Sequence, residues 1–125
     1  MIDHVILTVS NFERSVAFYN QVFKPLGAAM SSEFKGENGH PDLKGFSDGK
    51  TMFLWLKEGK PESKGVHIGF IANNRAQVDS FYAAALASEA EIIESPRVFN
   101  EYYPGYYAAW VLDPDGYELE IVNKS

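Results

Sequence analysis

Apolar and polar positions follow the same order in both halves of the chain. Residues 4–19 and 67–82 align without a gap, and each segment begins with an alternating stretch and continues with apolar residues at helical spacing. Four aligned pairs are identical: His4 with His67, Asn11 with Asn74, Phe18 with Phe81, and Tyr19 with Tyr82. This repeat predicts that one structural unit has been duplicated within the chain.

Each copy is predicted to contain a strand, a helix and three further strands. The first helix begins either at the capping box of Ser10 and Glu13 or at Asn11, and it ends before Pro25. The second helix begins at Asn74. The expected apolar stripes are Phe12, Val16, Tyr19 and Phe23 in the first helix, and Val78, Phe81, Ala85 and Leu86 in the second.

The strands alternate between the two faces of a sheet. They are predicted over residues 4–9, 28–34, 43–47, 51–56, 66–72, 90–95, 107–112 and 117–122. The fold class is therefore α+β, with two tandem βαβββ modules in a single domain of residues 1–125. The modules span about 1–58 and 65–125, and the polar segment Lys57–Lys64 joins them.

Three polar side chains fall on the sheet face that is turned away from the helices. His4 lies opposite the apolar residues of its strand, His67 takes the equivalent place in the second copy, and Glu120 lies between the apolar Leu119 and Ile121. If the sheets curve around a common space, these three side chains converge. Two imidazoles and one carboxylate suit Fe, Mn, Ni, Co or Zn and leave positions open for a substrate.

A simpler interpretation of the same residues stays open. A single histidine near the end of a strand is more often solvated than bound to a metal, and Glu120 stands close to the polar Glu118. The equivalent positions of His4 and His67 in the repeat favour the metal site. His40 has no such counterpart and is predicted to be a surface residue.

Composition excludes several other functions. The chain has no cysteine, which excludes disulfides, zinc–thiolate sites and a cysteine nucleophile. Its net charge of −6 disfavours nucleic acids and anionic membranes as partners. No signal peptide or membrane-spanning segment is expected, so a cytoplasmic location is predicted.

Four segments carry a family resemblance: Ile2–Val5, Glu13–Tyr19, Gly65–Ile68, and Asp113–Tyr117 followed by Leu119 and Glu120. In this order the chain resembles the glyoxalase/bleomycin resistance protein/extradiol dioxygenase group, the vicinal oxygen chelate superfamily. The resemblance implies two βαβββ modules whose sheets form a cup around a divalent metal held by His4, His67 and Glu120. It also implies a small-molecule substrate and a homodimer.

One position departs from the family pattern. Isomerases of the family use a fourth ligand, a glutamate on the last strand of the first module, and aligning the two hairpin turns places Phe53 there. A site of three ligands, two histidines and one glutamate, resembles that of the extradiol dioxygenases, which place a histidine or tyrosine near bound dioxygen. Tyr103 and Tyr107 are the candidate catalytic residues, and Tyr107 is preferred to Tyr106 because it alternates with Ala109.

Three functional hypotheses therefore stand. The first is a metal-dependent enzyme acting on vicinal oxygens, with isomerase, lyase and dioxygenase chemistry all open. The second is a metal-free protein that binds a small molecule or drug, as bleomycin resistance proteins do. The third is a regulatory or structural subunit that retains the fold with a vestigial site.

Overall fold

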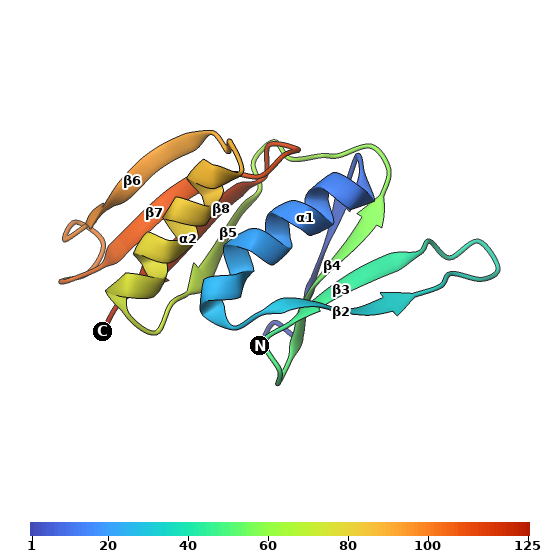
Figure 1. Cartoon of the computed structure of the whole chain (residues 1–125), viewed down its shortest axis with the longest axis horizontal. Coiled ribbons are helices and arrows are strands. Elements are labelled where there is room, and N and C mark those ends of the chain that lie inside the picture. Colours follow the sequence, from blue (N-terminus) through green and yellow to red (C-terminus); the bar gives the residue numbers. More distant parts are fainter. The chain divides into compact units, whose positions relative to one another are not determined.

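The two halves of the chain fold alike, each into a four-stranded sheet with one long helix (Figure 1). The computed structural model describes residues 1–125. It divides into Met1–Glu62 and Ser63–Ser125, here called unit 1 and unit 2. The boundary falls within the polar segment Lys57–Lys64. The α+β class and the repeated βαβββ unit are confirmed.

Unit 1 consists of β1 (Val5–Val9), α1 (Phe12–Phe23), the 3₁₀ helix η1 (Lys24–Leu26), β2 (Ala29–Phe34), β3 (Leu43–Ser47) and β4 (Met52–Glu58). Its strands lie in the order β1-β4-β3-β2. β1 runs parallel to β4, and the other two pairs are antiparallel.

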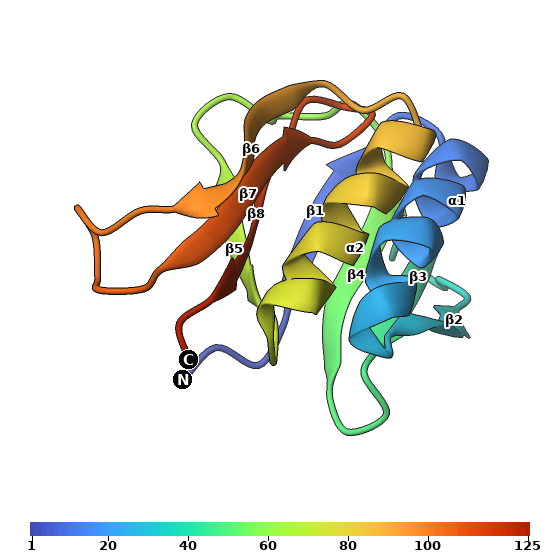
Figure 2. The ribbon, with the colours of Figure 1, turned by 60° about the vertical axis from the view of Figure 1, so that its left-hand side comes forward.

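Unit 2 consists of β5 (His67–Ile71), α2 (Arg75–Ala87), β6 (Ile92–Val98), β7 (Tyr107–Leu112) and β8 (Glu118–Asn123). The strand order is β5-β8-β7-β6, with β5 parallel to β8, so unit 2 repeats the topology of unit 1. The loop between β6 and β7 extends beyond the end of the sheet (Figure 2). Neither helix of the chain has the length and hydrophobicity that crossing a lipid bilayer requires.

Both long helices begin at an asparagine. Asn11 Oδ1 accepts a hydrogen bond from Arg14 N at 2.8 Å, and Asn74 Oδ1 accepts one from Gln77 N at 2.8 Å. These bonds satisfy N–H groups that have no partner inside the helix. Of the two starts considered for the first helix, Asn11 is therefore the cap, and Ser10 instead accepts from the guanidinium of Arg14.

The face of each sheet that packs on its helix is apolar. In unit 1, Tyr19, Phe23 and Phe46 are fully buried, with ring centroids 5.4 to 5.8 Å apart. In unit 2, α2 lies across β6, β7 and β8 (Figure 1) and buries Phe81 completely, together with Leu119 of β8. Burial of this area is the main driving force for folding of each unit.

Two predictions about unit 2 are corrected. Leu86 was expected in the apolar stripe of α2, but it is 49% exposed because it follows Ala85 directly and lies outside the buried arc. The strand predicted over 90–95 runs over Ile92–Val98 instead. It continues past Pro96 because β6 is an edge strand with register shifts, where the missing N–H does not interrupt the ladder.

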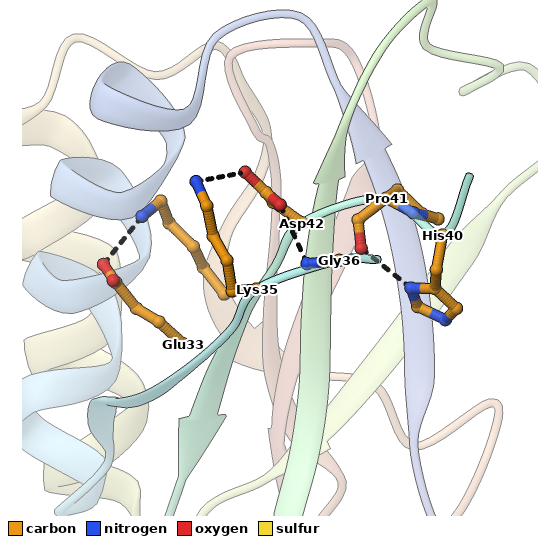
Figure 3. A network of polar contacts seen from close by, with 7 residues as sticks. Glu33, Lys35, Gly36, His40, Pro41 and Asp42 are labelled. Carbon is orange, nitrogen blue, oxygen red and sulfur yellow. Dashed lines mark hydrogen bonds and ion pairs between the residues drawn. The ribbon is translucent and has the colours of Figure 1, made fainter. Parts of the chain in front are cut away.

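A polar network holds the hairpin between β2 and β3 (Figure 3). The Asp42 carboxylate accepts hydrogen bonds from Gly36 N at 2.9 Å and Lys35 Nζ at 3.2 Å, and these bonds hold the pKa of Asp42 below its usual value. His40 is exposed and donates from Nδ1 to the carbonyl oxygen of Pro41 at 2.8 Å. The prediction that His40 is a surface residue is confirmed.

The buried arc of α2 leads to a stability prediction. Replacing Phe81 with alanine removes a fully buried ring, and we expect a loss of about 3–5 kcal/mol in the free energy of unfolding. Leu86→Ala on the same helix is the control and should cost far less, because Leu86 is half exposed. Urea denaturation measures both values, and equal losses would contradict this description of the core.

Candidate metal site and aromatic pocket

The register of two strands brings His67 and Glu120 together. β5 pairs with β8 so that His67 lies beside Glu118 and Gly69 lies beside Glu120, which places all four residues on the sheet face opposite α2. His67 Nε2 is 2.8 Å from Glu120 Oε1, and His67 Nδ1 is 2.8 Å from Glu118 Oε1. The two carboxylates therefore contact opposite nitrogens of one imidazole.

Glu120 is a buried carboxylate with two partners. Its side chain is 7% exposed, and its second oxygen, Oε2, accepts a hydrogen bond from the hydroxyl of Tyr106. Burial and this bond to Glu120 raise the pKa of Tyr106, so the phenol stays protonated at neutral pH. A buried carboxylate is costly unless a cation or donors compensate its charge, and the groups that contact it here are the half-exposed imidazole of His67 and the hydroxyl of Tyr106.

The imidazole of His67 has polar contacts with three side chains. Besides the two carboxylates, the indole N–H of Trp110 donates to Nε2 at 3.1 Å. Burial lowers the pKa of His67, but the hydrogen bonds to Glu120 and Glu118 outweigh this effect and raise it above the ordinary value. The same carboxylates that favour a proton on the ring also favour a metal cation beside it.

His4 belongs to unit 1 and precedes β1. It is exposed, and its Nδ1 is 2.6 Å from Asp3 Oδ1. No group of three or more histidine, aspartate or glutamate side chains forms a metal-binding arrangement in this structure. The structure thus assembles the pair His67 and Glu120, and the third ligand, His4, stays a prediction.

Beside His67 lies a pocket of about 260 Å³ with an aromatic wall. The rings of Trp110 and Phe99 are 4.6 Å apart, and Tyr102 stacks on Phe99 at 5.8 Å. The guanidinium of Arg97 lies 3.6 Å from the centroid of the Phe99 ring. The pocket therefore combines flat apolar surfaces with a cation and the imidazole, a combination typical of small-molecule sites.

The structure reverses the prediction about the tyrosines. Tyr107 points to the helix side of the sheet, where its hydroxyl donates to Asp79 of α2 at 2.6 Å, whereas Tyr106 reaches Glu120. Tyr107 alternates with Ala109, which is fully buried, so the two residues share the face packed on α2. The bond to Asp79 raises the pKa of Tyr107.

Other residues of the pocket were not recognised from the sequence, and one candidate lies outside its wall. Tyr103 does not line the pocket, whereas its neighbour Tyr102 does. Trp110 had a usable signal, since it pairs with Glu120 across β7 and β8 and must share its face. Arg97 and Phe99 follow the irregular part of β6, where alternation does not assign a face.

In unit 1 a tryptophan holds the position that corresponds to Glu120. Glu120 pairs with Gly69 and Trp110, and the residue with the same two strand neighbours in unit 1 is Trp55, which pairs with Ile6 and Gly45. The assignment of Phe53 is therefore wrong. A register shift beside the hairpin displaces Phe53, which packs on Phe23 at 5.3 Å.

Comparison with known proteins identifies the family. Residues 1–121 match the model of the glyoxalase/bleomycin resistance protein/dioxygenase superfamily. The chain belongs to this superfamily. The resemblance seen in the sequence is thereby confirmed, and it covers both units. No curated protein matches the chain significantly.

Solved structures of similar proteins share the superfamily fold. A glyoxalase/bleomycin resistance protein from Albidiferax ferrireducens is 22% identical with a TM-score of 0.79, covering 100% of this chain and 99% of that one. The fosfomycin resistance protein FosX from Mesorhizobium loti is 19% identical with a TM-score of 0.73, covering 100% and 92%. The trypanothione-dependent glyoxalase I of Leishmania major is 21% identical with a TM-score of 0.69, covering 99% and 86%. At these identities the likeness establishes the fold.

The contact between Tyr106 and Glu120 can be tested by removing one hydroxyl. Tyr106→Phe leaves an oxygen of a buried carboxylate without its donor, and we expect it to cost about 1–3 kcal/mol in the free energy of unfolding. Tyr107→Phe is the matched control. Its partner Asp79 is exposed, so water replaces the lost bond and the cost should stay below about 1 kcal/mol. Chemical denaturation compares the two variants, and a larger cost at Tyr107 would refute the assignment.

Proposed function

We propose that this chain is a metal-dependent enzyme that binds a small substrate through adjacent oxygen atoms, with His4, His67 and Glu120 as the metal ligands. The observation that carries the proposal is the 2.8 Å approach of His67 Nε2 to the buried Glu120 Oε1. Both atoms are ligand types that divalent transition metals prefer. Membership of the superfamily, whose solved members include a glyoxalase I, supports the same function.

The chemistry of this donor pair fits a divalent cation. With an unprotonated Nε2, which the indole N–H of Trp110 requires, two electron-rich atoms of His67 and Glu120 face each other. A cation that binds both atoms would relieve their repulsion and compensate the buried charge of Glu120. Because two ligands do not hold a metal firmly, the proposal needs His4 as the third.

The neighbouring side chains prepare this site for a substrate. Tyr106 holds one oxygen of Glu120, so the other oxygen keeps its orientation toward His67. The rings of Phe99 and Trp110 exclude water from one wall of the pocket and strengthen the electrostatic interactions there. A bound divalent metal would supply the Lewis acidity that polarises two adjacent substrate oxygens.

Trp55 bears on which of the three reaction types, isomerase, lyase or dioxygenase, the protein catalyses. In the isomerases of the family a glutamate at the corresponding position serves as a ligand and as a base, and the indole of Trp55 can do neither. This favours lyase or dioxygenase chemistry over the glyoxalase I isomerisation. We further propose that the protein is cytoplasmic. We also propose that it forms a homodimer, as small members of the superfamily usually do, and sedimentation equilibrium tests the dimer.

The aromatic wall of the pocket favours a second candidate function. Tyr102 and Trp110 offer flat surfaces, and Glu118 adds negative charge beside them, which together suit a planar cationic molecule bound without a metal. Such a protein would have no use for the paired ligands. Metal binding therefore separates the two functions.

Metal titration tests the proposed function. We expect the wild type to bind one equivalent of Co(II) or Zn(II), and His67→Ala, Glu120→Ala and His4→Ala each to lose more than about 100-fold in affinity, beyond the cost of losing a residue that only orients a ligand. His40→Ala is the control and should bind as the wild type does. Isothermal titration calorimetry gives the affinities.

The outcomes of this titration discriminate between the ligands. A wild type that binds no metal refutes the enzyme proposal and favours the binding protein. Unchanged affinity in His4→Ala alone would overturn the role of His4 and show that another group supplies the third ligand beside His67 and Glu120.

A further inference from the structure

A carboxylate lies against the same nitrogen of both candidate ligand histidines. In unit 2, Glu118 Oε1 is 2.8 Å from Nδ1 of His67, and in unit 1, Asp3 Oδ1 is 2.6 Å from Nδ1 of His4. A carboxylate can only accept, so each contact requires the proton to be on Nδ1. Which nitrogen of a histidine is left to bind a metal is set by the hydrogen bond that the other nitrogen makes.

A second contact of His67 also favours the tautomer with the proton on Nδ1. The indole N–H of Trp110 can only donate, and it lies 3.1 Å from His67 Nε2, so this nitrogen must be unprotonated to accept. Glu118 and Trp110 therefore act on opposite sides of the ring toward one result. Together they leave the lone pair of Nε2 available.

Glu120 opposes this choice. Its Oε1 lies 2.8 Å from Nε2 and would accept a proton from that nitrogen. A neutral ring protonated on Nε2 would satisfy Glu120, but it would turn the indole N–H of Trp110 toward another N–H and Glu118 toward a bare lone pair. The tautomer with Nδ1–H satisfies the contacts with Glu118 and Trp110. It leaves Nε2 and Glu120 Oε1 without a proton between them, and a cation could bind there.

Strand geometry explains why Glu118 can take this role. Glu118 and Glu120 are two residues apart on β8, so both project to the face on which His67 lies. His67 pairs with Glu118 itself, and the imidazole spans the distance between the two carboxylates. The alternation of one strand thus provides a carboxylate for each nitrogen of the ring.

We infer that Glu118 is a positioning residue: it accepts the Nδ1 proton of His67, fixes the ring in the Nδ1–H tautomer and so presents Nε2 to a divalent metal. This inference rests on the proposed function, because it concerns the same site. Asp3 makes the corresponding contact with His4 in unit 1, where it is more exposed. Carboxylates that hold the second nitrogen of a ligand histidine raise its basicity and its affinity for the metal.

The tautomer can be measured in the metal-free protein. We expect long-range ¹H–¹⁵N correlation spectra, recorded at a pH where the ring is neutral, to show His67 protonated on Nδ1. Glu118→Gln should keep this tautomer because the amide oxygen still accepts, and Glu118→Ala should shift the proton to Nε2, facing Glu120. Glu91→Gln is the control, since it removes an exposed carboxylate of unit 2 that does not line the pocket.

Metal affinity provides the second measurement, with Co(II) as the probe. Glu118→Ala should weaken binding about 10- to 100-fold, Glu118→Gln should recover most of this loss, and Glu91→Gln should bind as the wild type does. If Glu118→Ala does not fold, Glu118→Leu keeps the volume of the side chain without its acceptor and replaces it.

The two possible failures can be told apart. A wild type that binds no Co(II) overturns both the metal site and the role of Glu118. A wild type that binds Co(II), with unchanged affinity and an unchanged His67 tautomer in Glu118→Ala, overturns the role of Glu118 alone.

Discussion

The buried carboxylate of Glu120 is the constraint on which the arrangement of unit 2 depends. A charge that is 7% exposed needs compensating partners, and these come from two separate places: His67 on β5 and Tyr106 before β7. The indole of Trp110 in turn donates to His67. Only the parallel register of β5 and β8 brings the imidazole to this carboxylate. A slip of one residue would turn Glu120 into the core beneath α2.

The two units keep one topology but use it differently. At the two central strands unit 2 has Trp110 beside Glu120, and unit 1 has Gly45 beside Trp55. A side chain at Gly45 would lie 2.7 Å from the Trp55 ring, so the glycine is needed for the indole to lie across the strand. In both units a single tryptophan occupies this part of the sheet, but only unit 2 retains a carboxylate next to it. The two units therefore share a backbone topology, but the residues at these facing positions give them different chemical groups.

Much of the fold could be predicted from the sequence because the repeat doubled the signal. Strand alternation placed His67 and Glu120 on the correct face, and asparagine caps marked both helices. The failures have two physical causes. Tyr107 was preferred over Tyr106 because small Ala109 suggested a pocket, whereas Ala109 is a core residue beneath α2. Register shifts in β6 interrupt the alternation, so the sequence did not assign a face to the pocket residues there. A register shift beside the first hairpin led to the wrong choice of the position that corresponds to Glu120.

The polar groups around His67 in unit 2 are hydrogen-bond donors or carboxylates that already have a partner. None of these carboxylates is a base without a contact. Tyr106 keeps its proton because burial and Glu120 raise its pKa, and the Trp110 indole can only donate. Glu118 and Glu120 are both engaged with His67. A reaction that requires a protein carboxylate to abstract a substrate proton would have to break one of these contacts. A substrate that brought its own acidic oxygens to a bound metal would make no such demand. This distribution of protons supports the proposed chelation of vicinal oxygens, and Trp55 separately supports the proposal of lyase or dioxygenase chemistry rather than isomerisation.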